Sequence, residues 1–138
     1  MTRIATIPLA AGLIAATLGT AGLATPAAAG GSFSITIEGN SPESRRALRT
    51  GLELYSAYNA VRSGAAIRQN GRGNRAGIRQ DGRGNRGIVH QEGDGHSGTL
   101  DQRGARNAYG LFQFGRNTEA HVVQRGRGRT GATFQYGW

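Results

Sequence analysis

The second half of the chain alternates inward-type and outward-type residues in a pattern that returns every eleven positions. Each unit carries a small residue, then an aliphatic residue two positions later, then a glutamine two positions after that. Alternation with a period of two predicts a strand with one buried face, and the β-branched residues at its centre favour the same assignment. The aliphatic positions, which we predict to form the core, are Ile67, Ile78, Val89, Leu100, Leu111 and Val122, with Thr133 in the seventh unit.

The glutamines recur without a miss, and a glycine follows each of them by two positions. The glutamines are Gln69, Gln80, Gln91, Gln102, Gln113, Gln124 and Gln135. The glycines are Gly71, Gly82, Gly93, Gly104, Gly115, Gly126 and Gly137. An asparagine completes the unit at Asn74, Asn85 and Asn107, and His96, Thr118 and Arg129 replace it elsewhere. Glycine accepts positive φ and close backbone approach, and asparagine bonds turn backbone, so we predict one strand of about five residues and one tight turn per unit.

Seven units in register predict a stacked repeat fold for residues 65–138. Two strands and two turns make a flattened coil of 22 residues, and about three and a half coils make a two-sheet, all-β solenoid. Like residues then lie above one another at about 4.8 Å. Buried amides normally cost free energy, but stacked glutamines and asparagines can bond each other in ladders. The alternative for the glutamines is a solvated polar face, which needs no strict repetition.

Residues 22 apart also suit one another on the outward face. Opposite charges meet at Arg79 and Asp101 and at Asp81 and Arg103, and aromatic rings meet at Phe112 and Phe134 and at Phe114 and Tyr136. The columns that join Arg68 to His90 and Arg103 to Arg125 fit less well.

The first 64 residues have a different composition. Residues 1–29 read as a signal peptide, with Arg3, an apolar stretch and an Ala-rich cleavage site, although a retained membrane anchor is the alternative. We expect no transmembrane anchor after cleavage. Residues 30–64 predict a strand at 32–37 and a short helix that starts at Ser41 and Pro42. This segment could cap the end of the stack or be read by an export apparatus.

Composition argues against an enzyme. The chain has 138 residues, 24 of them glycine, a net charge of +9 and no cysteine, so it offers neither disulfides nor a cysteine-based metal site. His90, His96 and His121 fall at three different positions of the unit, with no nucleophile or carboxylate pair beside them. We therefore expect no catalytic site, no metal and no cofactor.

The repeat resembles that of the curlins, the subunits of bacterial curli fibres. The motif Gln-x-Gly-x-x-Asn-x-Ala-x-x-x-Gln stands intact from Gln69 to Gln80. The resemblance covers residues 65–138 and implies a secreted functional amyloid of the cell surface, a pilus-like (fimbrial) fibre for biofilm matrix and cell adhesion. It also implies three partners: copies of the chain itself, a nucleator subunit and an outer-membrane secretion pore. It does not distinguish a main subunit from a nucleator, or a folded soluble monomer from a disordered one.

The chain departs from the family plan at three points. Its N-terminal segment lacks a Gly-rich pattern. Tyr109 occupies a small-residue position, so we expect that strand to bulge or to open its corner. All 17 basic residues are arginine, which suggests the alternative of an exported Arg/Gly-rich binder of extracellular nucleic acid or anionic polysaccharide.

The ends of the stack are where we expect assembly. Only three residues follow Gln135, so we expect an uncovered strand edge there. We predict that Gln69 and Asn74 at one end, and Gln124 and Gln135 at the other, join molecule to molecule.

Overall fold

A computed structural model describes residues 30–59 and 64–138 of the chain. The signal peptide expected at residues 1–29 lies outside the described residues. Among the residues that are described, no helix combines the length and the apolar character needed to cross a membrane.

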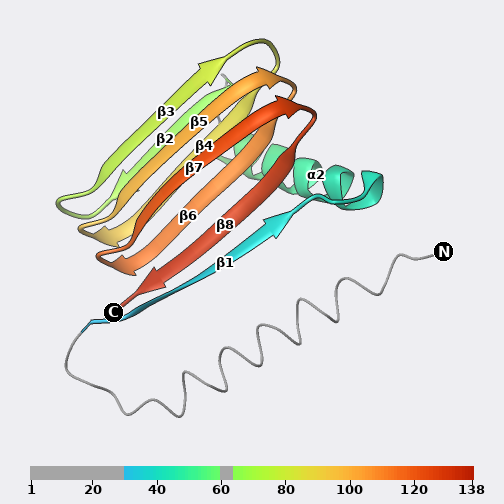
Figure 1. Ribbon diagram of the computed structural model, residues 1–138. Coiled ribbons are helices and arrows are strands. Elements are labelled where there is room, and N and C mark those ends of the chain that lie inside the picture. The colour runs from blue at the N-terminus through green and yellow to red at the C-terminus, as the bar shows by residue number, and fades with distance from the viewer. Residues whose placement is uncertain (1–29, 60–63) are drawn as a thin grey trace. The chain divides into compact units, whose positions relative to one another are not determined.

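Eight strands and one helix make up the described structure (Figure 1). The N-terminal segment holds strand β1 (Ser32–Glu38) and helix α2 (Pro42–Tyr58). The repeat strands are β2 (Ala65–Asn70), β3 (Arg75–Asp81), β4 (Arg86–Asp94), β5 (Ser97–Ala105), β6 (Ala108–Arg116), β7 (Glu119–Arg127) and β8 (Thr130–Gly137).

The repeat strands alternate between two sheets. The larger sheet has the order β1-β8-β6-β4-β2 and the smaller sheet has the order β3-β5-β7. Every pair of repeat strands is parallel, and each residue lies beside the residue 22 positions further on, as Gln91 does beside Gln113. The predicted two-sheet β-solenoid of eleven-residue units is confirmed.

The repeat strands contain six to nine residues and are therefore longer than the five residues that the sequence predicts. Most of them continue through the glycine that follows the glutamine. Gly104, for example, has φ +115° and still keeps its place opposite Gly126 in the ladder between β5 and β7. The turns are correspondingly shorter.

The core between the two sheets consists of two facing columns of aliphatic side chains, one from each sheet. Val89 and Leu111 are fully buried and Leu100 is 1% exposed, while Ile78 and Val122 are partly buried against them. The prediction for Ile67 is wrong, because this side chain is 47% exposed. It belongs to β2, the edge strand of the larger sheet, and no coil within residues 30–59 and 64–138 lies beyond it to cover it.

Tyr109 fits into the stack without the predicted bulge. Strand β6 keeps an unbroken parallel register, with Gly87 and Gly131 on either side of Tyr109. A Cβ atom at Gly131 would lie 2.7 Å from the tyrosine ring, so the missing side chain makes the room. The buried phenol hydroxyl bonds the Thr133 hydroxyl at 2.6 Å, which explains a threonine in the aliphatic column.

Helix α2 covers part of the outer face of the larger sheet. Ser41 caps it with a capping box and Pro42 opens its first turn. Leu52 is buried against Ile88 and Phe112, and Leu48 and Tyr55 pack around the same cluster. The sequence did not indicate which surface this helix packs against. The structure places it against Phe112, which belongs to the aromatic column on the outer face of the larger sheet.

The outward pairs are in the expected register, but their charges combine differently. Asp101 lies beside Arg79 across the strands, yet its ion pair is with Arg103 of its own strand at 2.8 Å. This hydrogen-bonded guanidinium lowers the pKa of Asp101. The aromatic column holds as expected, because Phe112 and Phe134 stack with ring centroids 4.9 Å apart.

Candidate functional site

The glutamines of the larger sheet form a continuous amide ladder. The side-chain amide of Gln69 donates to Gln91, that of Gln91 to Gln113, and that of Gln113 to Gln135, each at 2.8 Å. Gln91, Gln113 and Gln135 each also donate an N–H to a main-chain carbonyl at the start of a smaller-sheet strand. For Gln91 this acceptor is Arg75, at 2.7 Å. Each amide thus joins neighbouring coils and also joins the two sheets.

The smaller sheet carries a second ladder of the same design. Gln80 donates to Gln102 and Gln102 donates to Gln124, both at 2.8 Å. These amides also donate to main-chain carbonyls, as Gln102 does to Arg86 at 2.9 Å. Gln91, Gln102 and Gln113 have no exposed surface, and every N–H and carbonyl of these buried amides has a partner, which offsets the cost of desolvation.

Both ladders have a direction, and their two ends are chemically complementary. Every side-chain bond runs from an amide N–H to the carbonyl of the glutamine 22 residues later. Within the described residues, the Oε1 atoms of Gln69 and Gln80 therefore accept no hydrogen bond. At the opposite end, Gln124 and Gln135 each donate one N–H to a main-chain carbonyl, and the second N–H has no acceptor in the part of the chain that the structure describes. A free acceptor at one end of the stack thus matches a free donor at the other.

The asparagines link successive turns. The side chain of Asn85 donates to the Gly104 carbonyl at 3.0 Å and accepts from the Asn107 main-chain N–H at 3.1 Å, and Asn74 and Asn107 make the equivalent bonds. Where the asparagine is replaced, the substitutes bond each other: His96 and Thr118 are buried and their side chains lie 2.8 Å apart. His96 is therefore a member of the turn column.

The glycine that follows each glutamine permits close stacking of the coils. A Cβ atom at Gly82 would lie 1.9 Å from the Gly104 carbonyl oxygen, and Gly71, Gly93, Gly104 and Gly115 show the same approach to the next coil. Sequence reasoning missed a second special column, two residues after this glycine. Its members all have positive φ, even where they are Arg106 and Asn117. The signal was present in the sequence, because the other members, Gly73, Gly84, Gly95 and Gly128, are glycines.

The edges of the two sheets differ at the two ends of the stack. Strands β2 and β3 are edge strands at one end. At the other end, β7 is an edge strand, but β8 is paired along its length with β1. The expectation of an uncovered edge after Gln135 is therefore wrong for the larger sheet. The reason is that residues 32–38 supply an antiparallel strand from nearly 100 positions away.

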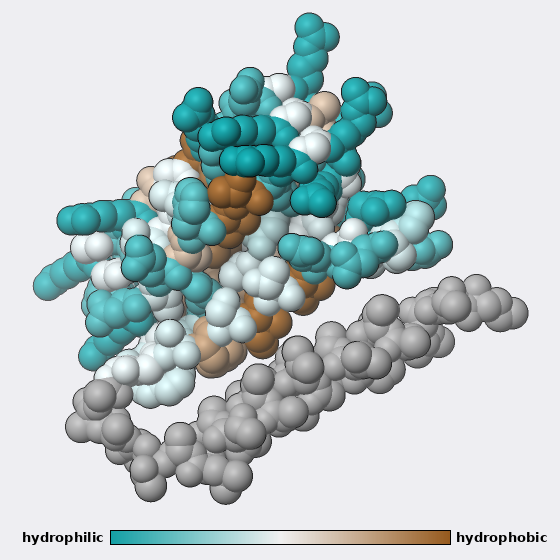
Figure 2. Space-filling view, viewed as in Figure 1, coloured by the Kyte–Doolittle hydropathy of each residue, from teal (hydrophilic) through white to brown (hydrophobic). Residues whose placement is uncertain are grey.

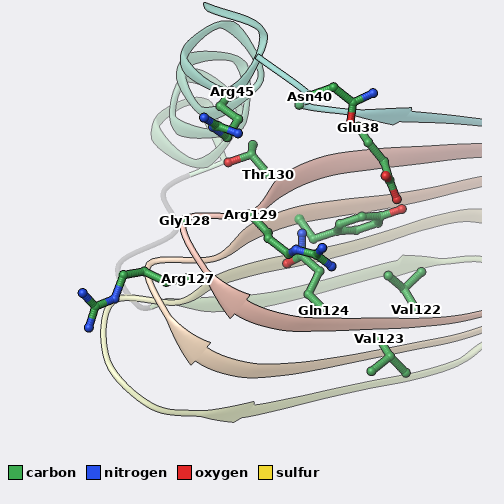
Figure 3. Close-up of a pocket in the computed structure, with 12 residues that line it drawn as sticks. Glu38, Asn40, Arg45, Val122, Val123, Gln124, Arg127, Gly128, Arg129 and Thr130 are labelled. Atoms are coloured by element: carbon green, nitrogen blue, oxygen red, sulfur yellow. The ribbon is translucent and has the colours of Figure 1, made fainter. Parts of the chain in front are cut away.

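A cavity of about 340 Å³ lies along the free edge of β7 (Figure 3). Its walls include Val122 and Gln124 of β7, Glu38 and Asn40 at the end of β1, and Thr130 at the start of β8. The stack thus ends at this side with one covered sheet and one open sheet.

The ionisable groups near the helix serve packing. The Tyr55 hydroxyl bonds Nδ1 of His90, and burial, with a smaller effect of the Arg68 guanidinium, lowers the pKa of His90. The Glu92 carboxylate opposes this shift. Within residues 30–59 and 64–138, no three histidine or carboxylate side chains gather in a way that could hold a metal ion.

Parallel strands in register, amide ladders and glycine-mediated close stacking define a two-sheet β-solenoid of the kind that builds structural proteins. The family model of the curlin associated repeat matches residues 62–93 and 74–104, so this chain carries curlin repeats, as the Gln69–Gln80 motif predicted. A search of curated proteins found no match, and neither did a search of solved structures.

Proposed function

We propose that this protein is a subunit of curli-type extracellular amyloid fibres and that it polymerises head to tail by stacking strand edges. The curlin repeats support a structural subunit of this general type. The observation that carries the proposal is the complementarity of the ladder ends. The unused N–H of Gln135 on one molecule matches the free Oε1 of Gln69 on the next.

Stacking would also complete the core. Ile67, which is 47% exposed at the edge of β2, would gain a neighbouring coil. An unpaired strand edge with a repeating hydrogen-bond pattern is a template for addition of a like strand, and the product is a cross-β fibre. In this proposal the subunit is exported, a nucleator and an outer-membrane pore assist it, and the fibres serve biofilm matrix and adhesion.

The test is fibre formation by the purified chain from residue 30 onward. Thioflavin fluorescence should rise with time, and aligned fibres should give a meridional reflection near about 4.7 Å. Gln69→Ala should slow growth, whereas Asn70→Ala, an exposed residue of the same strand whose side chain faces outward, should change it little. Prolonged incubation at high concentration without β-rich fibres would refute the proposal.

A second candidate function, binding of anionic polymers, rests on the arginines of one row of turns. Figure 2 shows hydrophilic side chains gathered over the turns, with apolar surface between them. The turns after β3, β5 and β7 bring together the exposed side chains of Arg83, Arg106, Arg127 and Arg129. The turns themselves, residues 82–85, 106–107 and 128–129, contain no acidic residue, and Asp81 ends the strand before the first of them. The opposite row places Asp94, the last residue of β4, beside Arg116.

This candidate predicts salt-sensitive binding of DNA or an acidic polysaccharide to that row. Replacing Arg83 and Arg127 together by glutamine should weaken binding and flatten its salt dependence. Replacing Arg72 and Arg116, on the opposite row, is the matched control. Equal losses in the two variants would show a non-specific charge effect and no site.

A further inference from the structure

Strand β1 covers the β8 edge, where the larger sheet would continue into a second copy. All seven of its residues pair with β8, from Ser32 beside Gly137 to Glu38 beside Gly131, and the Gly39 N–H extends the pairing to the Thr130 carbonyl at 2.8 Å (Figure 1). This pairing is antiparallel, whereas all the pairings among repeat strands are parallel.

The residues of β1 do not continue the repeat. Facing residues of an antiparallel pair point to the same side of the sheet, so Ser34 lies opposite Gln135 and Thr36 opposite Thr133 on the inner face. The Thr36 and Thr133 hydroxyls bond at 2.8 Å. Gln135, however, bonds no side chain of β1, so the amide ladder stops there. β1 satisfies the backbone edge of β8 and leaves the side-chain ladder open.

A junction between two copies that continues the larger sheet forms on β8. Within the described residues the larger sheet contains four repeat strands and the smaller sheet three, so β8 reaches further along the stack than β7 does. A second copy that approached the free edge of β7 would meet β8 before its own β3 could pair. Parallel pairing of β8 with the incoming β2 instead places Gln135 beside Gln69 and Thr133 beside Ile67, in the register found inside the molecule.

We propose that β1 is an exchangeable cap, and that a second copy of this chain adds only when its β2 displaces β1 from β8. The inference rests on the proposed fibre function and specifies its interaction surface, which is the β8 edge on one copy and the β2 edge on the next. Because a junction through the larger sheet joins these two edges, each molecule added in this way requires the release of one β1.

The two competing pairings differ in what they bury. Six of the seven residues of β1 are exposed, including Phe33 and Ile37 at 37% and 38%. Its ring contact with β8, between Phe33 and Tyr136, has centroids 6.1 Å apart and is open to solvent. An incoming β2 adds the Gln135–Gln69 amide bond and covers Ile67, neither of which β1 provides. The exchange therefore trades a loose cap for a continuation of the repeat.

A reversible covalent lock tests the cap. The chain contains no cysteine, and facing residues of antiparallel strands lie within disulfide distance, so Thr36→Cys with Thr133→Cys can join β1 to β8. Seeded elongation is measured for this variant when oxidised and when reduced, with the two single variants as controls. We expect the oxidised form to elongate only in proportion to the fraction left reduced, and reduction to restore growth.

The opposite change should accelerate growth. Successive N–H groups of a strand point to opposite edges, so one of residues 35 and 36 donates its N–H toward β8. Replacing both, as Ile35→Pro with Thr36→Pro, removes that donor. This variant should shorten the lag and raise the elongation rate relative to Ile35→Val with Thr36→Ser. If circular dichroism shows that the cysteine variant does not fold, the proline variant alone tests whether β1 acts as a cap.

The outcomes separate the cap from the fibre. Equal elongation of oxidised and reduced protein, or no acceleration in the proline variant, overturns the cap and leaves the fibre function standing. Absence of fibres from the wild-type chain, with or without seeds, overturns the fibre function itself, and with it the cap.

Discussion

Replacing an interior glutamine and a terminal glutamine of the ladders should separate folding from assembly. Gln102 lies inside the smaller-sheet ladder with neighbours on both sides, and Gln135 is the last member of the larger-sheet ladder. We compare Gln102→Ala with Gln135→Ala. The first should mainly weaken the monomer, and the second should slow fibre elongation while it costs the monomer less stability.

The expected loss at Gln102 follows from its three side-chain bonds. It accepts from Gln80 and donates to Gln124 and to the Arg86 carbonyl, at 2.8, 2.8 and 2.9 Å. Gln80 is only half-buried and keeps its bond to Gly64, so water can replace the lost acceptor. The Gln124 carbonyl and the Arg86 carbonyl lose a donor in a dry setting. At about 1–3 kcal/mol for each of these two buried orphans, the free energy of unfolding should fall by about 2–6 kcal/mol.

The expected loss at Gln135 is smaller. Its side chain is half-buried, and its bond to the Glu119 carbonyl at 3.0 Å lies at the surface. Water can satisfy the Glu119 carbonyl, but Gln113 has no exposed surface and loses an acceptor, so the free energy of unfolding should fall by about 1–3 kcal/mol, less than at Gln102. The unused N–H that would bond Gln69 of the next copy is lost outright.

Urea unfolding of the monomer and seeded growth of fibres measure the two effects. Gln102→Ala should lower the unfolding midpoint and change the elongation rate only through the population of folded monomer. Gln135→Ala should lower the midpoint less and slow elongation directly. Equal losses of stability and equal slowing of elongation in the two variants would refute the assignment of assembly to the ladder ends.

Three further predictions concern the fold. Gly104→Ala should prevent close stacking and lower the free energy of unfolding by more than about 2 kcal/mol, because its Cβ would lie 2.0 Å from the carbonyl oxygen of the next coil. Gly51→Ala, at an open helix position, should raise the free energy of unfolding by about 0.5–1 kcal/mol, and thermal unfolding compares the two variants. Tyr109→Phe should lower the free energy of unfolding in urea by about 1 kcal/mol, since the buried Thr133 hydroxyl loses one of its two bonds and keeps the one to Thr36. An unchanged midpoint would contradict the bond to Tyr109. Burial lowers the pKa of His90 below its ordinary 6.5, so the neutral ring stabilises the fold fully above that pH and this stabilisation is lost on acidification. Between about pH 7.5 and about pH 5, the free energy of unfolding should therefore fall more in the wild type than in His90→Gln.

The repeat region could be read from the sequence because its information is local and periodic. Residues such as Gln91 and Gln113 occupy equivalent positions in units 22 residues apart, so one choice of strand and turn settles every coil and its register. The inward face follows from the alternation, and the interior members of the core columns are buried as a result. The column of positive φ at Gly73 and its equivalents was equally available in the sequence, although it was overlooked.

The ends of the stack and the outer face could not be read in this way. The pairing of β1 with β8 joins segments nearly 100 residues apart, and no periodicity relates Ser34 to Gln135. The exposure of Ile67 depends on there being no coil beyond it, and the accommodation of Tyr109 depends on glycines in the neighbouring coils. The period specifies how one coil meets the next, because each unit repeats the same contacts. What meets the first and last coils is decided by contacts made once, and only the tertiary structure contains them.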